Sequence, residues 1–172
     1  MTETIRYAWG QSSLGEFLAA MSARGLVLME FSDPGSAAVD ALRTRFPEAE
    51  VIEDPAFMTE TLKRLGELIE HPDRQSDIPL DLRGSEFECR VWNALREIPA
   101  GQTESYGEIA RRLGIPMEAR EVAGACAANT MAVVIPCHRV VKKGGAIAGY
   151  RWGFKRKRAL LEREQSAEFQ LA

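Results

Sequence analysis

Long apolar runs, a basic leader and repeated segments are all missing from this 172-residue chain. No stretch approaches the roughly 20 apolar residues that a membrane-spanning helix needs. The opening residues Met1 to Thr4 supply neither a basic segment nor an apolar run, so we expect no signal peptide. We therefore expect a cytoplasmic protein that does not bind membranes. Its length allows one good hydrophobic core or two modest ones.

Cysteine is scarce, and its spacing fits neither a metal site nor a disulfide framework. The three cysteines, Cys89, Cys126 and Cys137, form no CxxC or CxH motif. An odd number without framework spacing is typical of reduced thiols in a cytosolic protein. We therefore expect no disulfide, no metal site and no cofactor.

Positive charge is also in deficit overall, but not evenly along the chain. The net charge is −3. Residues 1–82 carry 7 Lys and Arg against 15 Asp and Glu, whereas residues 83–164 carry 15 against 9. Binding to phosphate groups needs local positive charge, so any nucleic-acid surface is expected in the second half. Domains that bind no nucleic acid also show such a difference, so it does not decide the function.

A polar segment from Glu70 to Pro79 with two prolines reads as a linker. It predicts two domains, residues 1–81 and 82–172. The first should be a small α/β domain. Its expected strands are Ile5–Trp9, Leu14–Met21 and Leu26–Phe31, and its expected helices are Ala37–Phe46 and Phe57–Ile69. No catalytic constellation is evident in it.

The second half has the apolar periodicity of helices. One helix is expected over Ser85–Ile98, with Ser85 as its cap, and another over Tyr106–Leu113. Gly114 ends that helix, and Pro116 suits the first position of the next. Two short helices joined by a tight turn predict a helix-turn-helix, a motif that also occurs in proteins without DNA-binding activity.

The helix after this turn is rich in small residues, and Arg120 is its one long cation. The small residues are Ala119, Ala123, Gly124, Ala125, Ala127 and Ala128. Such a face suits close approach to a DNA minor groove, with the arginine inserted where a base has left the stack. Small residues equally permit tight packing of a helix in a core, so both interpretations stay open.

The most informative segment is Ile135–Val141, where Cys137 and His138 interrupt a β-branched, apolar run. A thiolate is a strong nucleophile, and histidine is the commonest base that produces one. Neighbouring side chains of an extended strand point to opposite faces, so a direct dyad of the kind found in cysteine hydrolases is not favoured. A bridging water could link the two groups, or Cys137 could be a small core residue.

Several separated motifs then resemble one family, the O6-alkylguanine-DNA alkyltransferases. The matching segments are Pro136–Val140 at the cysteine, Arg120–Asn129 at the recognition helix and asparagine hinge, Thr103–Gly107, Gly149–Gly153 and Leu160–Glu164. The resemblance covers nearly the whole chain. It is strongest to the carboxy-terminal methyltransferase domain of adaptive-response proteins.

The resemblance implies a fold and an activity. The fold would be a ribonuclease H-like α/β domain followed by a mostly helical domain with a helix-turn-helix. The activity would be suicidal repair of double-stranded DNA bound through the minor groove, in which O6-alkylguanine, and also O4-alkylthymine, is flipped out of the duplex. The alkyl group would pass irreversibly to Cys137, once per molecule of a monomeric protein.

Roles for individual residues also come from the resemblance. His138, acting through water and oriented by Glu164, would deprotonate Cys137, Asn129 would fix the turn before it, and Tyr106 would contact and protonate the base. Substrate contacts would come from Tyr106, Val140, Gly149, Tyr150 and Arg151. DNA contacts would come from Arg120, Ala119, Ala123, Gly124 and Ala127. Arg151 stands where some relatives carry a small hydroxyl residue, which leaves the range of accepted alkyl groups open.

Three alternatives stay open. Some relatives recognise alkylated guanine without a reactive cysteine, and Cys137 argues against that class. A regulatory fragment would derive from a longer protein with a zinc-binding amino-terminal domain, which this sequence does not contain, so we expect no zinc. A cysteine hydrolase would use Cys137 and His138 with turnover. The basic run Lys155–Arg158 is interpreted as a solvated helix start, with contact to phosphate as a secondary possibility.

Overall fold

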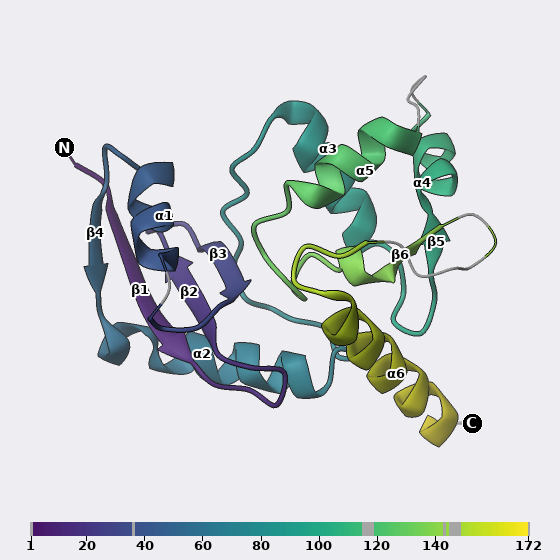
Figure 1. Ribbon diagram of the computed structural model, residues 1–172, viewed down its shortest axis with the longest axis horizontal. Helices are drawn as coiled ribbons and strands as arrows, with labels where there is room; N and C mark the ends of the chain where they lie inside the picture. The colour runs from purple at the N-terminus through teal and green to yellow at the C-terminus, as the bar shows by residue number, and fades with distance from the viewer. Residues whose placement is uncertain (1, 36, 115–118, 143, 145–148, 172) are drawn as a thin grey trace.

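The computed structural model describes residues 2–35, 37–114, 119–142, 144 and 149–171, and for 166–171 the backbone alone. A mixed α/β region comes first along the chain, and a mostly helical region follows (Figure 1). This order confirms the expected α/β region followed by a mostly helical one.

The first region is built on a four-stranded mixed sheet. Its strands are β1 (Thr4–Gly10), β2 (Phe17–Met21), β3 (Leu26–Phe31) and β4 (Glu50–Glu53). They lie in the order β3-β2-β1-β4, with β4 parallel to β1 and the other pairs antiparallel. Helix α1 (Ala38–Arg45) packs with Ile5 and Tyr7, whereas α2 (Pro55–Glu70) packs with Ala8 on the other face. Alternate residues of β1 thus serve two cores.

One strand prediction in this region was wrong in its first residue, and one strand was not predicted. The strand expected from Leu14 begins only at Phe17, because Ser12 and Gly15 close a turn through mutual backbone hydrogen bonds of 3.1 and 3.0 Å. Strand β4 was missed. It is four residues long, and neither of its ends is buried, so it lacks an alternating apolar pattern.

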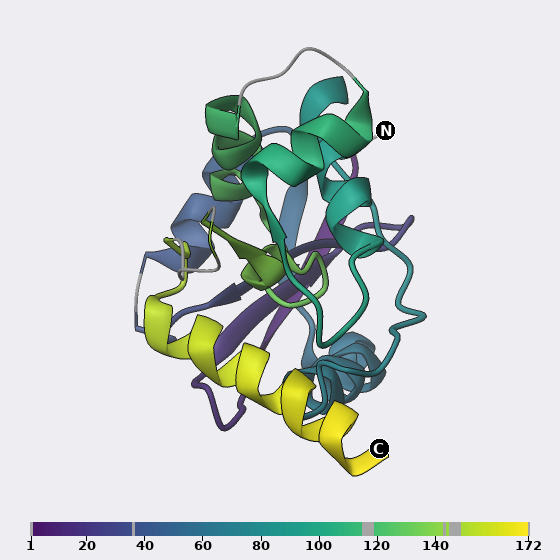
Figure 2. The same ribbon diagram turned by 90° about the vertical axis from the view of Figure 1, so that its right-hand side faces the viewer.

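The second region holds the remaining elements. They are α3 (Glu86–Arg96), β5 (Glu104–Ser105), α4 (Tyr106–Leu113), α5 (Ala119–Ala127), the 3₁₀ turn η1 (Cys137–Arg139), β6 (Val140–Val141) and α6 (Phe154–Leu171). Ser85 caps α3 as predicted, in a capping box with Glu88. Pro116, expected to open the small-residue helix, lies outside the described residues. Figure 2 shows α6 beside the end of α2, where Arg163 Nη1 donates to Ile69 O at 2.6 Å.

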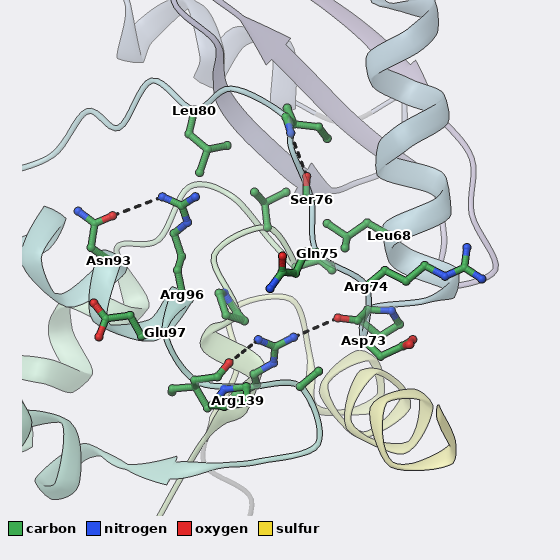
Figure 3. A pocket seen from close by; sticks show the side chains of 18 residues that line it. Leu68, Asp73, Arg74, Gln75, Ser76, Leu80, Asn93, Arg96, Glu97 and Arg139 are labelled. Carbon is green, nitrogen blue, oxygen red and sulfur yellow. Dashed lines mark hydrogen bonds between the residues drawn. The ribbon is translucent and has the colours of Figure 1, made fainter. Parts of the chain in front are cut away.

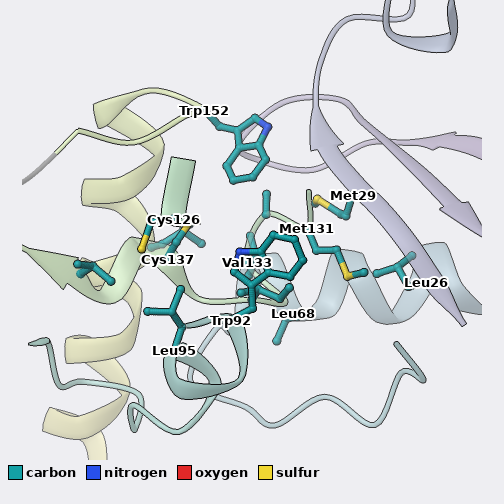
Figure 4. Close-up of a cluster of buried hydrophobic side chains, with 14 of the residues drawn as sticks. Leu26, Met29, Leu68, Trp92, Leu95, Cys126, Met131, Val133, Cys137 and Trp152 are labelled. Carbon is teal, nitrogen blue, oxygen red and sulfur yellow. The ribbon is translucent and has the colours of Figure 1, made fainter. Parts of the chain in front are cut away.

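The two regions share a hydrophobic core around Trp92 (Figure 4). Trp92 is 1% exposed, and its Nε1 donates to Ala125 O at 2.9 Å, which joins α3 to α5. Met29 of β3 contributes to the same core and also pairs with the segment after α5. Its N–H donates to Thr130 O, and its carbonyl accepts from Ala132 N, both at 2.9 Å. The sheet edge therefore holds the chain that leads to Cys137. No helix within the described residues is long and apolar enough to cross a membrane.

Candidate active site

Cys137 is the first residue of the turn η1, not part of an extended strand as its β-branched neighbours suggested. Backbone bonds from Cys137 N to Ile135 O (2.7 Å) and from Arg139 N to Pro136 O (2.9 Å) close this turn. The side chain is buried, and burial raises the pKa of the Cys137 thiol to about 11, although a hydrogen bond from Asn129 opposes the rise. At neutral pH the thiol therefore needs a base to become a nucleophile.

Asn129 is fully buried and holds both the turn and the sulfur. Its Nδ2 donates to Ile135 O at 3.0 Å and to Cys137 Sγ at 3.2 Å, and its Oδ1 accepts from Met131 N at 2.9 Å. Between these anchors, Val133 has φ +68°, which is strained for a β-branched residue. The hydrogen bonds of Asn129 thus hold a strained loop behind the thiol.

His138 and Glu164 form a fully buried pair. His138 Nε2 lies 2.7 Å from Glu164 Oε1, with 0% exposure of both side chains. Burial lowers the pKa of His138, so the ring is neutral at pH 7. Burial alone would raise the pKa of Glu164, but hydrogen bonds from His138 and Arg139 outweigh it and lower that pKa. A carboxylate only accepts, so Nε2 carries the hydrogen and Nδ1 keeps its lone pair.

Nδ1 is therefore the basic nitrogen of His138. It is buried, and no protein group among the described residues hydrogen-bonds to it. Glu164 lies on α6 and accepts a hydrogen bond from Nε2, the other nitrogen of the His138 ring. This bond fixes the orientation of the ring, as a carboxylate does in an acid–base relay. The arrangement can take a proton from a nearby group and stabilise the resulting imidazolium.

The remaining base-contacting candidates lie around η1 and the start of α6. Tyr106 is the first residue of α4 and half-buried, and burial, followed by the charges of the Cys126 and Cys137 thiols, raises its pKa. Val140 is buried on β6 beside β5. The Tyr150 hydroxyl oxygen is buried, and burial raises its pKa well above the usual value. The other two candidates, Gly149 and Arg151, are exposed.

The candidate DNA-contacting residues share one side of α5. Ala119, Arg120, Gly124 and Ala127 are exposed and Ala123 is half-buried. The opposite side, formed by Val122, Ala125 and Cys126, faces the core. The small residues of this helix thus divide between a packed face and an open one.

The site can now be compared with known proteins. The family model described as "6-O-methylguanine DNA methyltransferase, DNA binding domain" matches residues 86–166. The inducible methylated-DNA–protein-cysteine methyltransferase of Bacillus subtilis is 35% identical over 156 residues, which cover 90% of this chain and 87% of that protein. This chain belongs to the methylated-DNA–protein-cysteine methyltransferase family.

Other members of the methylated-DNA–protein-cysteine methyltransferase family differ in length. The bifunctional transcriptional activator/DNA repair enzyme Ada of Escherichia coli is 40% identical over 164 residues, which are 95% of this chain and 46% of Ada. The chain thus spans about half the length of that relative. The crystal structure of Mycobacterium tuberculosis OGT in complex with DNA matches with a TM-score of 0.79 and 36% identity, covering 94% of this chain and 93% of that one.

Arg139 supports the buried pair of His138 and Glu164, a role that the sequence did not indicate. Its Nε donates to Glu164 Oε1 at 3.0 Å. Its Nη1 donates to Ile98 O at 2.7 Å and its Nη2 to Pro72 O at 3.0 Å, the two bonds drawn from Arg139 in Figure 3. Arg139 lines a hollow of about 750 Å³ between the two regions, which Cys137 does not line. Neither His138 nor Glu164 lines this hollow, and because Cys137 does not line it either, it is not the opening to the sulfur.

Lys157 corrects the interpretation of Lys155–Arg158 as a solvated helix start. It is fully buried, and its Nζ donates to Val140 O at 2.5 Å. Lys157, Leu160 and Glu164 are all buried, at spacings of three and four residues. This spacing predicts that one face of α6 is buried. The pattern is not recognisable as an apolar face in the sequence, because two of the three residues are charged. Among the described residues, no group of His, Cys, Asp or Glu could hold a metal ion.

Proposed function

We propose that this chain repairs alkylated DNA by moving the alkyl group of O6-alkylguanine, or of O4-alkylthymine, onto Cys137. The observation that carries the proposal is a buried thiol held by Asn129 beside a neutral His138 that is bonded to buried Glu164. The relative in B. subtilis is named a methylated-DNA–protein-cysteine methyltransferase, and the similar M. tuberculosis protein was crystallised with DNA. Both support a reaction at this cysteine.

In this mechanism the Cys137 sulfur attacks the saturated carbon of the alkyl group, so an S–C bond forms as the C–O bond to guanine breaks. His138 takes the thiol proton through Nδ1 and a water molecule, and Glu164 stabilises the charged ring. The departing guanine anion takes a proton from Tyr106, and the proton held by His138 returns through water to the phenolate, so that both side chains regain their starting states. A thioether has no good leaving group, so each molecule reacts once.

The proposed DNA contact is the exposed side of α5, directed to the minor groove. Its small residues Ala119, Ala123, Gly124 and Ala127 allow close backbone approach, and Arg120 fills the space left by the flipped base. Helix α4 ends at Gly114 in the left-handed conformation, at φ +68°. We therefore propose that α4 and α5 form the helix-turn-helix.

We also propose a ribonuclease H-like domain over residues 1–81 and a DNA-binding, alkyl-accepting domain over residues 82–172. The chain remains attached to the sheet up to Asp81, whose N–H donates to Leu26 O at 2.8 Å. The protein would act as a monomer, because one chain supplies the thiol, the relay and the α5 surface. It would act in the cytoplasm, as its few cysteines without framework spacing suggest.

Stoichiometry tests the proposed function. The protein would be mixed with an excess of duplex DNA that contains one O6-methylguanine, and restored guanine would be counted against protein. We expect one repaired base per protein molecule and no further turnover. Repeated turnover of an ester or peptide would instead indicate a cysteine hydrolase, and DNA binding without a change in protein mass would indicate a non-catalytic reader.

A further inference from the structure

Arg151 joins three separate segments of the chain. Its Nη1 donates to Asn129 O at 2.8 Å, and its Nη2 donates to Glu30 Oε1 at 2.7 Å. The guanidinium also lies 5.4 Å from the centre of the Trp152 ring. Two of its nitrogens and one of its faces are thus engaged by protein groups.

The residues that Arg151 contacts are themselves anchored. Glu30 lies on β3 next to Met29, which pairs with Thr130 and Ala132. The Glu30 side chain is 15% exposed and that of Arg151 is 39% exposed, so only the carboxylate of this ion pair is shielded from water. The backbone of Asn129 therefore receives one bond from the arginine immediately before a segment held on the sheet edge. The side chain of the same residue donates to Cys137 Sγ at 3.2 Å.

We infer that Arg151 is a positioning residue, which fixes the backbone of Asn129 from the β3 edge so that its amide stays directed at the Cys137 sulfur. This inference rests on the proposed function. It assigns Arg151 a role other than contact with the alkylated base. A donor on the Asn129 carbonyl fixes the peptide plane from which the amide side chain extends, and small displacements of a catalytic group are costly.

The electrostatics agree with this geometry. Hydrogen bonding from Asn129 lowers the Cys137 pKa against the larger effect of burial, and the positive charges of Lys157 and, by a smaller amount, Arg151 lower it further. Loss of Arg151 would thus weaken the effect of Asn129 on the thiolate and remove that of its own charge. Because the thiol has a pKa of about 11 and is largely protonated at both pH 7 and pH 9, the resulting defect should be similar at the two values.

Single-turnover rates with the free base O6-benzylguanine and with methylated duplex DNA test the inference. We expect Arg151→Ala to slow both reactions by roughly 10- to 100-fold at pH 7, and by a similar factor at pH 9, because the thiol stays largely protonated below its pKa of about 11. Arg151→Lys keeps a donor and should recover at least part of the rate. If the alanine variant fails to fold, the rates of Arg151→Lys and Glu30→Gln are measured in its place.

A charge swap separates positioning from simple clamping. Glu30→Arg combined with Arg151→Glu restores an ion pair, but a carboxylate cannot donate to Asn129 O, so the rate should stay low. The matched control is Arg163→Ala, because Arg163 also joins the two regions, through Ile69 O and Ser13 Oγ, both at 2.6 Å. It should lower thermal stability without changing the rate.

Several outcomes would overturn the inference. They are a wild-type rate in Arg151→Ala, full rescue by the charge swap, or a loss confined to duplex DNA or to one alkyl group. The last result would make Arg151 a substrate contact. If the wild-type protein itself gains no alkyl group on Cys137, the proposed function fails, and that result is distinct from any of these.

Discussion

Replacing Glu164 by glutamine should slow alkyl transfer strongly at neutral pH, with a loss that shrinks as the pH rises. Glu164 Oε1 accepts from His138 at 2.7 Å and from Arg139 at 3.0 Å. Glutamine keeps the size of the side chain but removes the negative charge that stabilises a protonated imidazole. His138 would then be a weaker base toward Cys137.

The magnitude follows from the buried thiol. With a Cys137 pKa of about 11, a thiol without its relay is ionised to about one part in 10⁴ at pH 7. General-base catalysis typically contributes about 10²- to 10⁴-fold, so we expect a loss of at least about 100-fold at pH 7. The rate of the variant should then rise roughly tenfold per pH unit up to pH 9, as the thiolate fraction does.

Single-turnover rates from pH 6 to 9 would measure this effect, with His138→Gln as a parallel variant. Glu162→Gln is the matched control, because Glu162 is exposed on the same helix. DNA affinity should be nearly unchanged in every variant. A wild-type rate for both Glu164→Gln and His138→Gln at pH 7, or a defect that grows with pH, would refute the relay.

Other predictions concern DNA, acid and backbone conformation. Arg120→Ala should weaken repair of duplex DNA far more than reaction with O6-benzylguanine, which needs no base flipping, and equal losses would contradict that role. Denaturant unfolding should show stability falling below about pH 6.5 and again below 4.5, because the folded-state pKa values of His138 and Glu164 both lie below these ordinary values. Gly25→Ala should cost at least about 1–3 kcal/mol of unfolding free energy, because φ is +155° and the added carbon lies 2.5 Å from a carbonyl oxygen. Gly66→Ala, with no described atom within 4 Å of the added carbon, should not destabilise.

Local signals in the sequence were sufficient for the elements that are stabilised locally. The helix after Ser85 was predictable because its capping box and apolar spacing lie within one segment. Strand β3 was predicted at its observed bounds, Leu26–Phe31, since five of its six residues are apolar, and these five are buried. Strand β4 was not predicted, because its pairing with β1 joins residues far apart in sequence.

The site divides in the same way. Cys137 and His138 could be selected from their neighbours, but the turn that carries them depends on Asn129 and on pairing with β3. Glu164 looks like a solvated residue in a charged helix, and only the family resemblance identified it. Its burial is produced by contacts with His138 and Arg139 that no local pattern encodes.

Mass mapping of the protein after one reaction with methylated duplex DNA tests the central claim most directly. We predict one methyl group, located on Cys137, and no methyl group in Cys137→Ala. Cys126 should stay unmodified, because burial raises its pKa to about 12 and no base lies next to it in the sequence. A methyl group on Cys126 or Cys89, or methylation that persists in Cys137→Ala, would contradict the assignment of Cys137 as the alkyl acceptor.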